Sequence, residues 1–167
     1  MSEDFQSYRP LLFSIAYRMT GSASEAEDIV QDSYLRYHAA APSEIRSLKS
    51  YLSTIVTRLA LDHLKSARIQ REQYIGPWLP EPILTGDSAL AALQNVEQRE
   101  SITTAFLVLL ETLSPHERAV FLLREVFEYE HAEIAEILGL SAANCRQLFH
   151  RAQAHLAARR RLSLIHI

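Results

Sequence analysis

The sequence predicts an all-α protein made of two small helical domains joined by a proline-rich linker. Apolar residues make up 48% of the 167 residues, and there are only four glycines and six prolines, so helices can run through most of the chain. In several segments the apolar residues recur every three or four positions, which is the period of an amphipathic helix. Three of the prolines gather in residues 77–82 and interrupt this pattern.

We expect the first domain to cover residues 1–69 and to contain three helices. The expected helices run from Asp4 to Met19, from a capping box of Ser24 and Glu27 onward, and from Leu48 to Ile69. A loop from His38 to Ser47 is expected between the second and the third. The side chains expected to be buried are Tyr8, Leu11, Leu12, Ile15 and Ala16 in the first helix, Ala26, Ile29, Val30, Ser33, Tyr34 and Tyr37 in the second, and Leu52, Ile55, Val56, Leu59 and Leu64 in the third.

A linker is predicted over residues 70–88, where prolines and glycines are too dense for a regular helix. The second domain is expected over residues 89–161, and residues 162–167 form an apolar tail outside it. A long helix is expected from Ala89 to Thr112. The residues Ser114, Pro115 and Glu117 then supply a cap, a first-turn proline and a capping-box partner for a helix that continues through Val126.

The segment from His131 to Leu156 has the pattern of a helix-turn-helix, HAEIAEILGLSAANCRQLFHRAQAHL. Gly139 suits the left-handed end of the first helix, and Ser141 can cap the second. The inward residues are expected to be Ile134, Ala135 and Leu138, then Leu140, then Leu148 and Ala152 flanked by Cys145 and Phe149. The outward residues Asn144, Arg146, Gln147, His150 and Arg151 are expected to face a DNA major groove.

Charge is distributed unevenly along the chain, although the net charge is only -3. Four acids and no basic residue lie in residues 25–32, whereas six basic residues and one acid lie in residues 46–71. A further five arginines and no acid follow Ile137. An acidic face together with two basic faces is what a protein needs to contact another protein and a polyanion together.

Several classes of function find no support in the sequence. It has no glycine-rich phosphate loop and no histidines at metal-ligand spacing, so we expect no catalytic residues, no metal and no cofactor, and no enzymatic activity. The only cysteine, Cys145, cannot form an internal disulfide, which suits a reducing compartment. The chain has no apolar run of membrane-spanning length and an acidic, polar N-terminus, so we expect a cytoplasmic protein that does not bind a membrane.

Three blocks together resemble bacterial RNA polymerase sigma factors of the small extracytoplasmic-function type: residues 26–38, residues 45–68 and the helix-turn-helix. The segment REQYIGPWLPEP is similar to the subgroup in which a SnoaL-like domain usually follows the second sigma domain. This chain ends soon after Arg161, so that domain is not expected in it. The resemblance implies a sigma region 2-like domain, a sigma region 4-like domain, and a linker that threads along the polymerase.

The resemblance implies core RNA polymerase, through its β′ clamp and β subunit, and promoter DNA as partners, with any anti-sigma factor unidentified. The residues it assigns to polymerase binding are Glu27, Asp28, Gln31 and Asp32. The residues it assigns to the −10 element are Arg46, Lys49, Tyr51, Arg58, Lys65 and Arg68. The residues it assigns to the −35 element are Asn144, Arg146, Gln147, His150 and Arg151.

Two other classes of function remain open at this point. The first is a stand-alone helix-turn-helix transcriptional regulator whose first domain senses a signal or dimerises. The second is a helical interaction scaffold that binds no DNA. The basic third helix and the proline-rich linker favour a sigma factor over a simple regulator, which needs neither. Salt dependence separates both DNA-binding classes from the scaffold, because phosphate contacts weaken as salt rises.

Overall fold

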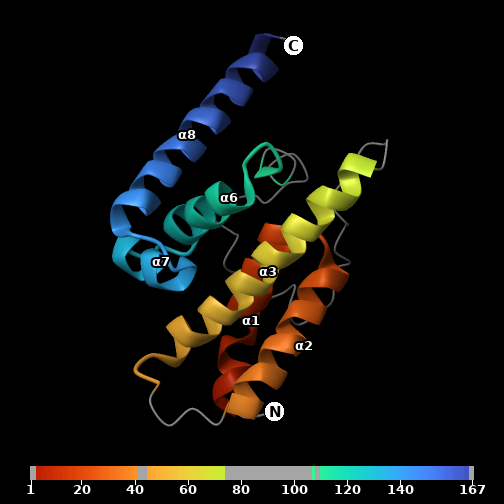
Figure 1. Ribbon diagram of the computed structural model, residues 1–167, viewed down its shortest axis with the longest axis vertical. Helices are drawn as coiled ribbons and strands as arrows, with labels where there is room; N and C mark the ends of the chain where they lie inside the picture. Colours follow the sequence, from red (N-terminus) through yellow and green to blue (C-terminus); the bar gives the residue numbers. More distant parts are fainter. Residues whose placement is uncertain (1–2, 41–44, 74–106, 108–109, 166–167) are drawn as a thin grey trace.

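The computed structural model describes residues 3–40, 45–73, 107 and 110–165, and every regular element in these residues is helical (Figure 1). The N-terminal unit consists of α1 (Glu3–Thr20), α2 (Ala23–Ala40) and α3 (Leu48–Gln73). The C-terminal unit consists of α6 (Pro115–Phe121), a π-helix η1 (Leu122–Val126), α7 (His131–Leu138) and α8 (Ala142–Ile165). The expected all-α class is confirmed.

In the N-terminal unit, α1 packs against both α2 and α3. The periodicity identified most of its core, because Leu12, Val30 and Leu52 are fully buried. Six expected core side chains are only partly buried: Tyr8, Leu11, Tyr34, Tyr37, Ile55 and Leu59. In α1, the buried apolar residues that the pattern missed are Phe5, Phe13, Tyr17 and Met19. They were missed because α1 is covered on two sides, so its buried surface is wider than one apolar stripe.

Several helix ends differ from the expectation. Ser22 caps α2, since its Oγ accepts a hydrogen bond from the Glu25 amide at 3.2 Å, so the capping box of Ser24 and Glu27 is wrong. Helix α2 continues through Ala40, so His38–Ala40 are helical and do not belong to the predicted loop. Helix α3 continues through Gln73. Residues 41–44 of the loop and residues 74–88 of the linker lie outside the described residues.

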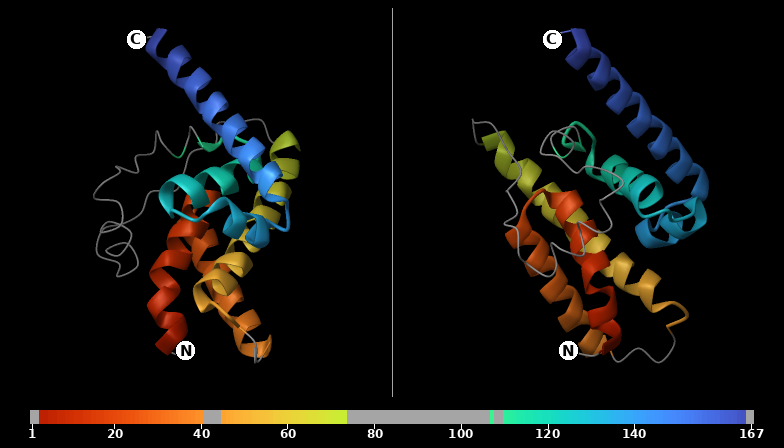
Figure 2. Two further views of the ribbon diagram at one scale, coloured as in Figure 1. Left: turned by 90° about the vertical axis from the view of Figure 1, so that its left-hand side faces the viewer. Right: turned by 180° about the vertical axis from the view of Figure 1, so that it is seen from behind.

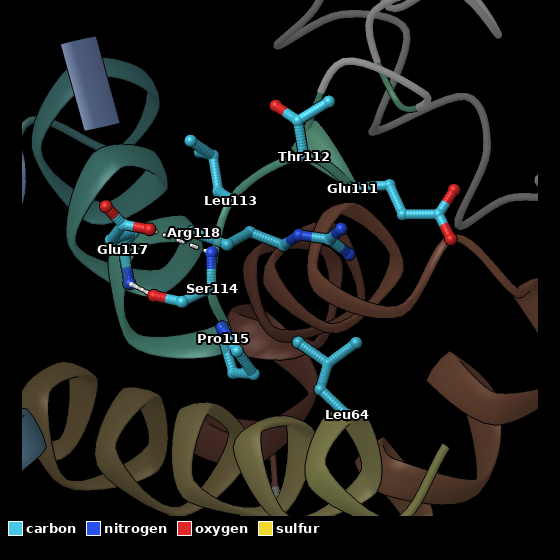
Figure 3. A pocket seen from close by; sticks show the side chains of 8 residues that line it. All are labelled: Leu64, Glu111, Thr112, Leu113, Ser114, Pro115, Glu117 and Arg118. Atoms are coloured by element: carbon cyan, nitrogen blue, oxygen red, sulfur yellow. Dashed lines mark hydrogen bonds between the residues drawn. The ribbon is translucent and has the colours of Figure 1, made fainter. Parts of the chain in front are cut away.

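The C-terminal unit starts with the predicted capping box. The Ser114 amide donates to Glu117 Oε1 at 2.9 Å, and the Glu117 amide donates to Ser114 Oγ at 3.2 Å (Figure 3). Pro115 occupies the first turn, as expected. Residues 111–113 form a turn, so the helix expected up to Thr112 ends earlier; most of that predicted helix lies outside the described residues.

The helix that begins at Pro115 does reach Val126, but its last part, η1, is π-helical. The Phe127 amide donates to the Leu122 carbonyl at 3.1 Å, which closes the wide turn. Glu128 follows with a φ of 59°, a left-handed conformation that costs free energy for a residue with a side chain. This irregular segment turns the chain from η1 into α7.

The two units share one continuous core, since α3 contacts α6 and α7, and α1 contacts η1. Arg118 of α6 crosses the boundary: its Nη1 donates to the Met19 carbonyl at 2.5 Å, and its Nε donates to the Leu110 carbonyl at 3.0 Å. A cavity of about 410 Å³ lies where Leu64 of α3 meets the start of α6 (Figure 3). Helix α8 extends away from the N-terminal unit toward the C-terminus (Figure 2).

Candidate nucleic-acid interface

The turn between α7 and α8 has the geometry that the sequence predicted. Gly139 ends α7 in the left-handed conformation, at φ 68° and ψ 35°, and the Leu140 amide donates to the Ala135 carbonyl at 2.9 Å. Ser141 then caps α8, because its Oγ accepts from the Asn144 amide at 3.0 Å. These local bonds fix the angle at which α8 leaves α7.

The inner face of α8 differs slightly from the expected one. Cys145 and Ala152 are completely buried, whereas Leu148 and Phe149 are only partly covered. Helix α6 packs directly on α8, with the Phe121 and Phe149 rings stacked 6.2 Å apart. In α7 the buried residues are Ile134 and Ile137, of which Ile137 was not expected. The cause is that α7 also contacts α3, which covers a second side of this short helix.

The outer face of α8 carries the five side chains that were predicted to contact DNA. All five are exposed, namely Asn144, Arg146, Gln147, His150 and Arg151. Within the described part of the chain, no hydrogen bond or ion pair engages their side chains. Spacings of three and four residues bring them onto adjoining turns of one helix, where they can contact a single surface together.

Burial shifts the pKa of two side chains beneath this face in the direction that favours their neutral forms. Burial, with a smaller contribution from Arg124 and Arg146, lowers the pKa of His131, whose ring meets Phe149 edge-on. Burial also raises the pKa of the Cys145 thiol against the opposing effect of Arg146. Because a reactive cysteine needs an accessible thiolate, the buried Cys145 acts as a packing residue.

The residues predicted for the −10 element fall into different surroundings on α3. Arg46 and Lys65 are exposed, and Arg68 lies near the end of the helix. Tyr51 is half-buried and meets the Tyr37 ring edge-on at 6.3 Å. The structure therefore keeps these residues on one helix and its preceding loop.

The other two predicted −10 residues contact the C-terminal unit. The Lys49 ammonium lies 5.1 Å from the centre of the Tyr129 ring. Arg58 Nε donates to the Ile137 carbonyl at 3.0 Å, at the end of α7. Sequence reasoning missed the role of Tyr129, since a single tyrosine in a loop carries no periodic signal.

The residues predicted for polymerase binding lie on α2, also in different surroundings. Asp28 and Gln31 are exposed. Glu27 accepts from Arg9 of α1 at 2.9 Å, so its carboxylate also holds two helices together. Asp32 is half-exposed and accepts from Arg36 on the next turn at 3.4 Å. Leu35 is 56% exposed on the same side of α2, an apolar neighbour that the sequence pattern did not single out.

Other kinds of site receive no support from the described residues. In residues 3–40, 45–73, 107 and 110–165, no three histidine, cysteine or acidic side chains gather as metal ligands would. In the same residues, no helix has both the length and the apolar character required to cross a bilayer.

Two family descriptions match the chain, one for each helical unit. Sigma-70 region 2 matches residues 5–69, and Sigma-70 region 4 matches residues 103–156. The first match covers most of α1, all of α2 and most of α3, and the second covers α6, η1, α7 and the first part of α8. The order and content of these two units therefore agree with the resemblance noted from the sequence motifs.

The chain is also similar in sequence to curated sigma factors. The chain is 43% identical to the ECF RNA polymerase sigma factor SigJ of Mycobacterium tuberculosis over 155 residues, which cover 93% of this chain and 49% of SigJ. It is 35% identical to the probable ECF sigma factor SigI of the same species, over 92% of this chain and 53% of SigI. The chain thus spans about half the length of these curated relatives.

Solved structures share the fold. The crystal structure of M. tuberculosis SigJ matches with a TM-score of 0.75 and 40% identity, over 93% of this chain and 53% of that one. The sigma factor RpoE of Bartonella quintana, solved with the anti-sigma factor NepR, matches with a TM-score of 0.68 and 20% identity, over 93% of this chain and 95% of that one. The SnoaL-like subgroup and the domain boundaries stay predictions. On the paired region matches and these relatives, the chain belongs to the ECF sigma factors of the sigma-70 family.

Proposed function

We propose that this chain binds core RNA polymerase and directs transcription initiation to promoters with particular −10 and −35 elements. The observation that carries the proposal is the outer face of α8, where five exposed polar side chains stand beyond a capped turn. Such side chains near the start of the second helix of a helix-turn-helix reach base edges in the major groove. We assign Asn144, Arg146 and Gln147 to bases of the −35 element, and His150 and Arg151 to phosphates.

The N-terminal unit supplies the other two contacts in this proposal. On α2, the acidic and polar face of Glu27, Asp28, Gln31 and Asp32 binds a basic surface of the β′ clamp, where complementary charge sets orientation and association rate. On and just before α3, the basic and aromatic residues bind the melted −10 element: Arg46, Lys49, Tyr51, Arg58, Lys65 and Arg68. The protein acts in the cytoplasm as a binding factor and turns over no substrate. A stand-alone regulator is less favoured, because it needs no region 2.

Co-purification with bacterial core polymerase tests the first contact. Asp32→Arg places a cation on the α2 face and is expected to reduce the amount of chain retained by core polymerase. Glu133→Arg makes the same change of charge at an exposed acidic residue of α7 and serves as the control. If core polymerase retains both variants equally, α2 is not part of the polymerase interface.

Run-off transcription on a promoter library tests base reading. Arg146→Ala is expected to relax the preference at one −35 position, because a good base contact discriminates by about 1–3 kcal/mol. Arg159→Ala removes the same charge from another exposed turn of α8 and is expected to leave the preference unchanged. If the parental chain directs no selective initiation with core polymerase, the proposed function is wrong.

A further inference from the structure

The first turn of α8 presents an exposed methyl group beside its polar side chains. Helix α8 begins at Ala142, directly after the Ser141 cap, and the Cys145 amide donates to the Ser141 carbonyl at 3.0 Å. Of the two alanines in this turn, Ala142 is half-buried and Ala143 is exposed. Sequence reasoning did not assign Ala143 to DNA, because an alanine has neither a charge nor a hydrogen-bonding group in its side chain.

The position of Ala143 places its methyl group at the end of α8 that enters a groove. Arg146 and Gln147 follow it by three and four residues, so the three side chains lie on adjoining turns of one face. The Cα–Cβ bonds of a helix tilt toward its N-terminus, and in this motif the N-terminal residues of the second helix meet the base edges. The Ser141 cap and the fully buried Cys145 hold this turn on the rest of the unit. A side chain as short as that of alanine can therefore touch a base edge here.

A methyl group distinguishes base pairs because only one base edge matches it. In the major groove, thymine presents a methyl group, whereas the other three bases present only hydrogen-bond donors and acceptors. A polar base edge covered by a methyl group loses its water and gains no partner, which costs free energy. Contact with a thymine methyl instead removes apolar surface of both groups from water.

We propose that Ala143 reads the 5-methyl group of a thymine in the −35 element. The inference rests on the proposed function, because it requires α8 to lie in the major groove of that element. Four residues of helix rise about 6 Å, and successive base pairs are about 3.4 Å apart. The thymine therefore lies, on either strand, within about two base pairs of the base that Gln147 contacts.

Replacing thymine by uracil tests this contact, because uracil lacks only the 5-methyl group. Holoenzyme made from core polymerase and the parental chain first selects a −35 element from the promoter library. Each thymine of that element is then replaced singly by uracil, and the two duplexes compete for the holoenzyme. At one position the uracil duplex is expected to bind about fourfold more weakly, which is the effect that burial of one methyl group predicts.

Two glycine variants show which side chain makes the contact. Ala143→Gly removes the methyl group from the protein and is expected to abolish the difference between thymine and uracil at that position. Ala154→Gly is the matched control, because it removes a methyl group from another exposed alanine of α8, and it is expected to keep the fourfold difference. Each comparison uses one protein on two duplexes, so the cost of glycine to helix stability cancels.

The inference is overturned if the selected element has no thymine, or if uracil weakens binding of the parental chain at no position. It is also overturned if the uracil effect persists in Ala143→Gly, since another group would then contact the methyl, or if both glycine variants lose it. The proposed function fails in a different way, when the parental chain selects no −35 element at all. Failure of the inference alone leaves that selection intact.

Discussion

Replacing Arg118 with methionine is expected to destabilise the fold by about 3–5 kcal/mol. The side chain is only 3% exposed, yet it makes hydrogen bonds to the Leu110 and Met19 carbonyls, at 3.0 Å and 2.5 Å. A hydrogen bond from a charged donor contributes about 1.5–3 kcal/mol, and methionine leaves both buried carbonyls without that donor. Methionine fills much of the same volume, so the loss comes mainly from polar contacts and little from a cavity.

Thermal and urea unfolding followed by circular dichroism measure this loss. A change of that size lowers the melting temperature by roughly 10 °C in a chain of this length. Arg124→Met is the matched control, because Arg124 is 36% exposed and its bonds to Tyr129 and Glu130 are longer, at 3.2 Å and 3.4 Å. We expect the control to lose about 1 kcal/mol or less. Equal losses in the two variants would refute the view that Arg118 joins the two units.

Three further predictions concern the turn, the cap and pH. Gly139→Ala is expected to cost about 1–2 kcal/mol in urea unfolding, from backbone strain alone, since the added Cβ would meet Arg58 at an ordinary 3.8 Å; an unchanged midpoint contradicts this. Ser114→Ala is expected to cost about 1 kcal/mol in the same assay, and a neutral result would deny the capping box a role in stability. Burial lowers the pKa of His116 and His131 in the folded chain. Their contribution to the free energy of unfolding is therefore present above pH ~6.5 and is lost as the pH falls through the lowered pKa values. The double variant with glutamine at both histidines should flatten that decline, and persistence of the parental slope would assign it to other groups.

Local signals in the sequence predicted the parts of the fold that local chemistry determines. The cap at Ser114 and the turn at Gly139 and Ser141 were both predicted, because each involves bonds within a few residues. The cap of α2 was predicted at Ser24, but it is Ser22. An acidic residue follows each serine by three positions, so only the observed hydrogen bond from the Glu25 amide to Ser22 Oγ distinguishes them. The three- and four-residue spacing of apolar residues predicted both the helix α8 and the face of it that is exposed.

Contacts between distant segments could not be predicted in this way. Ser53 and Tyr129 lie 76 residues apart in sequence, and neither stands out within its own segment. Arg18 and Arg118 are buried although arginine is usually exposed, and Arg18 lies 5.4 Å from the centre of the Phe127 ring. Their surroundings are created only when the two units pack, so composition and period assign such residues to the surface. The engagement of Lys49 and Arg58 by the C-terminal unit was missed on the same grounds.

The π-helical turn of η1 gives this segment a tolerance of length that a regular helix lacks. A π turn accommodates one residue more than an α turn, and it does so within residues 122–126. Deleting one residue there would let the segment return to α-helical winding, with Tyr129 and α8 close to their present orientation. Deleting one residue from a regular helix such as α6 would instead rotate everything downstream by about 100° about the helix axis.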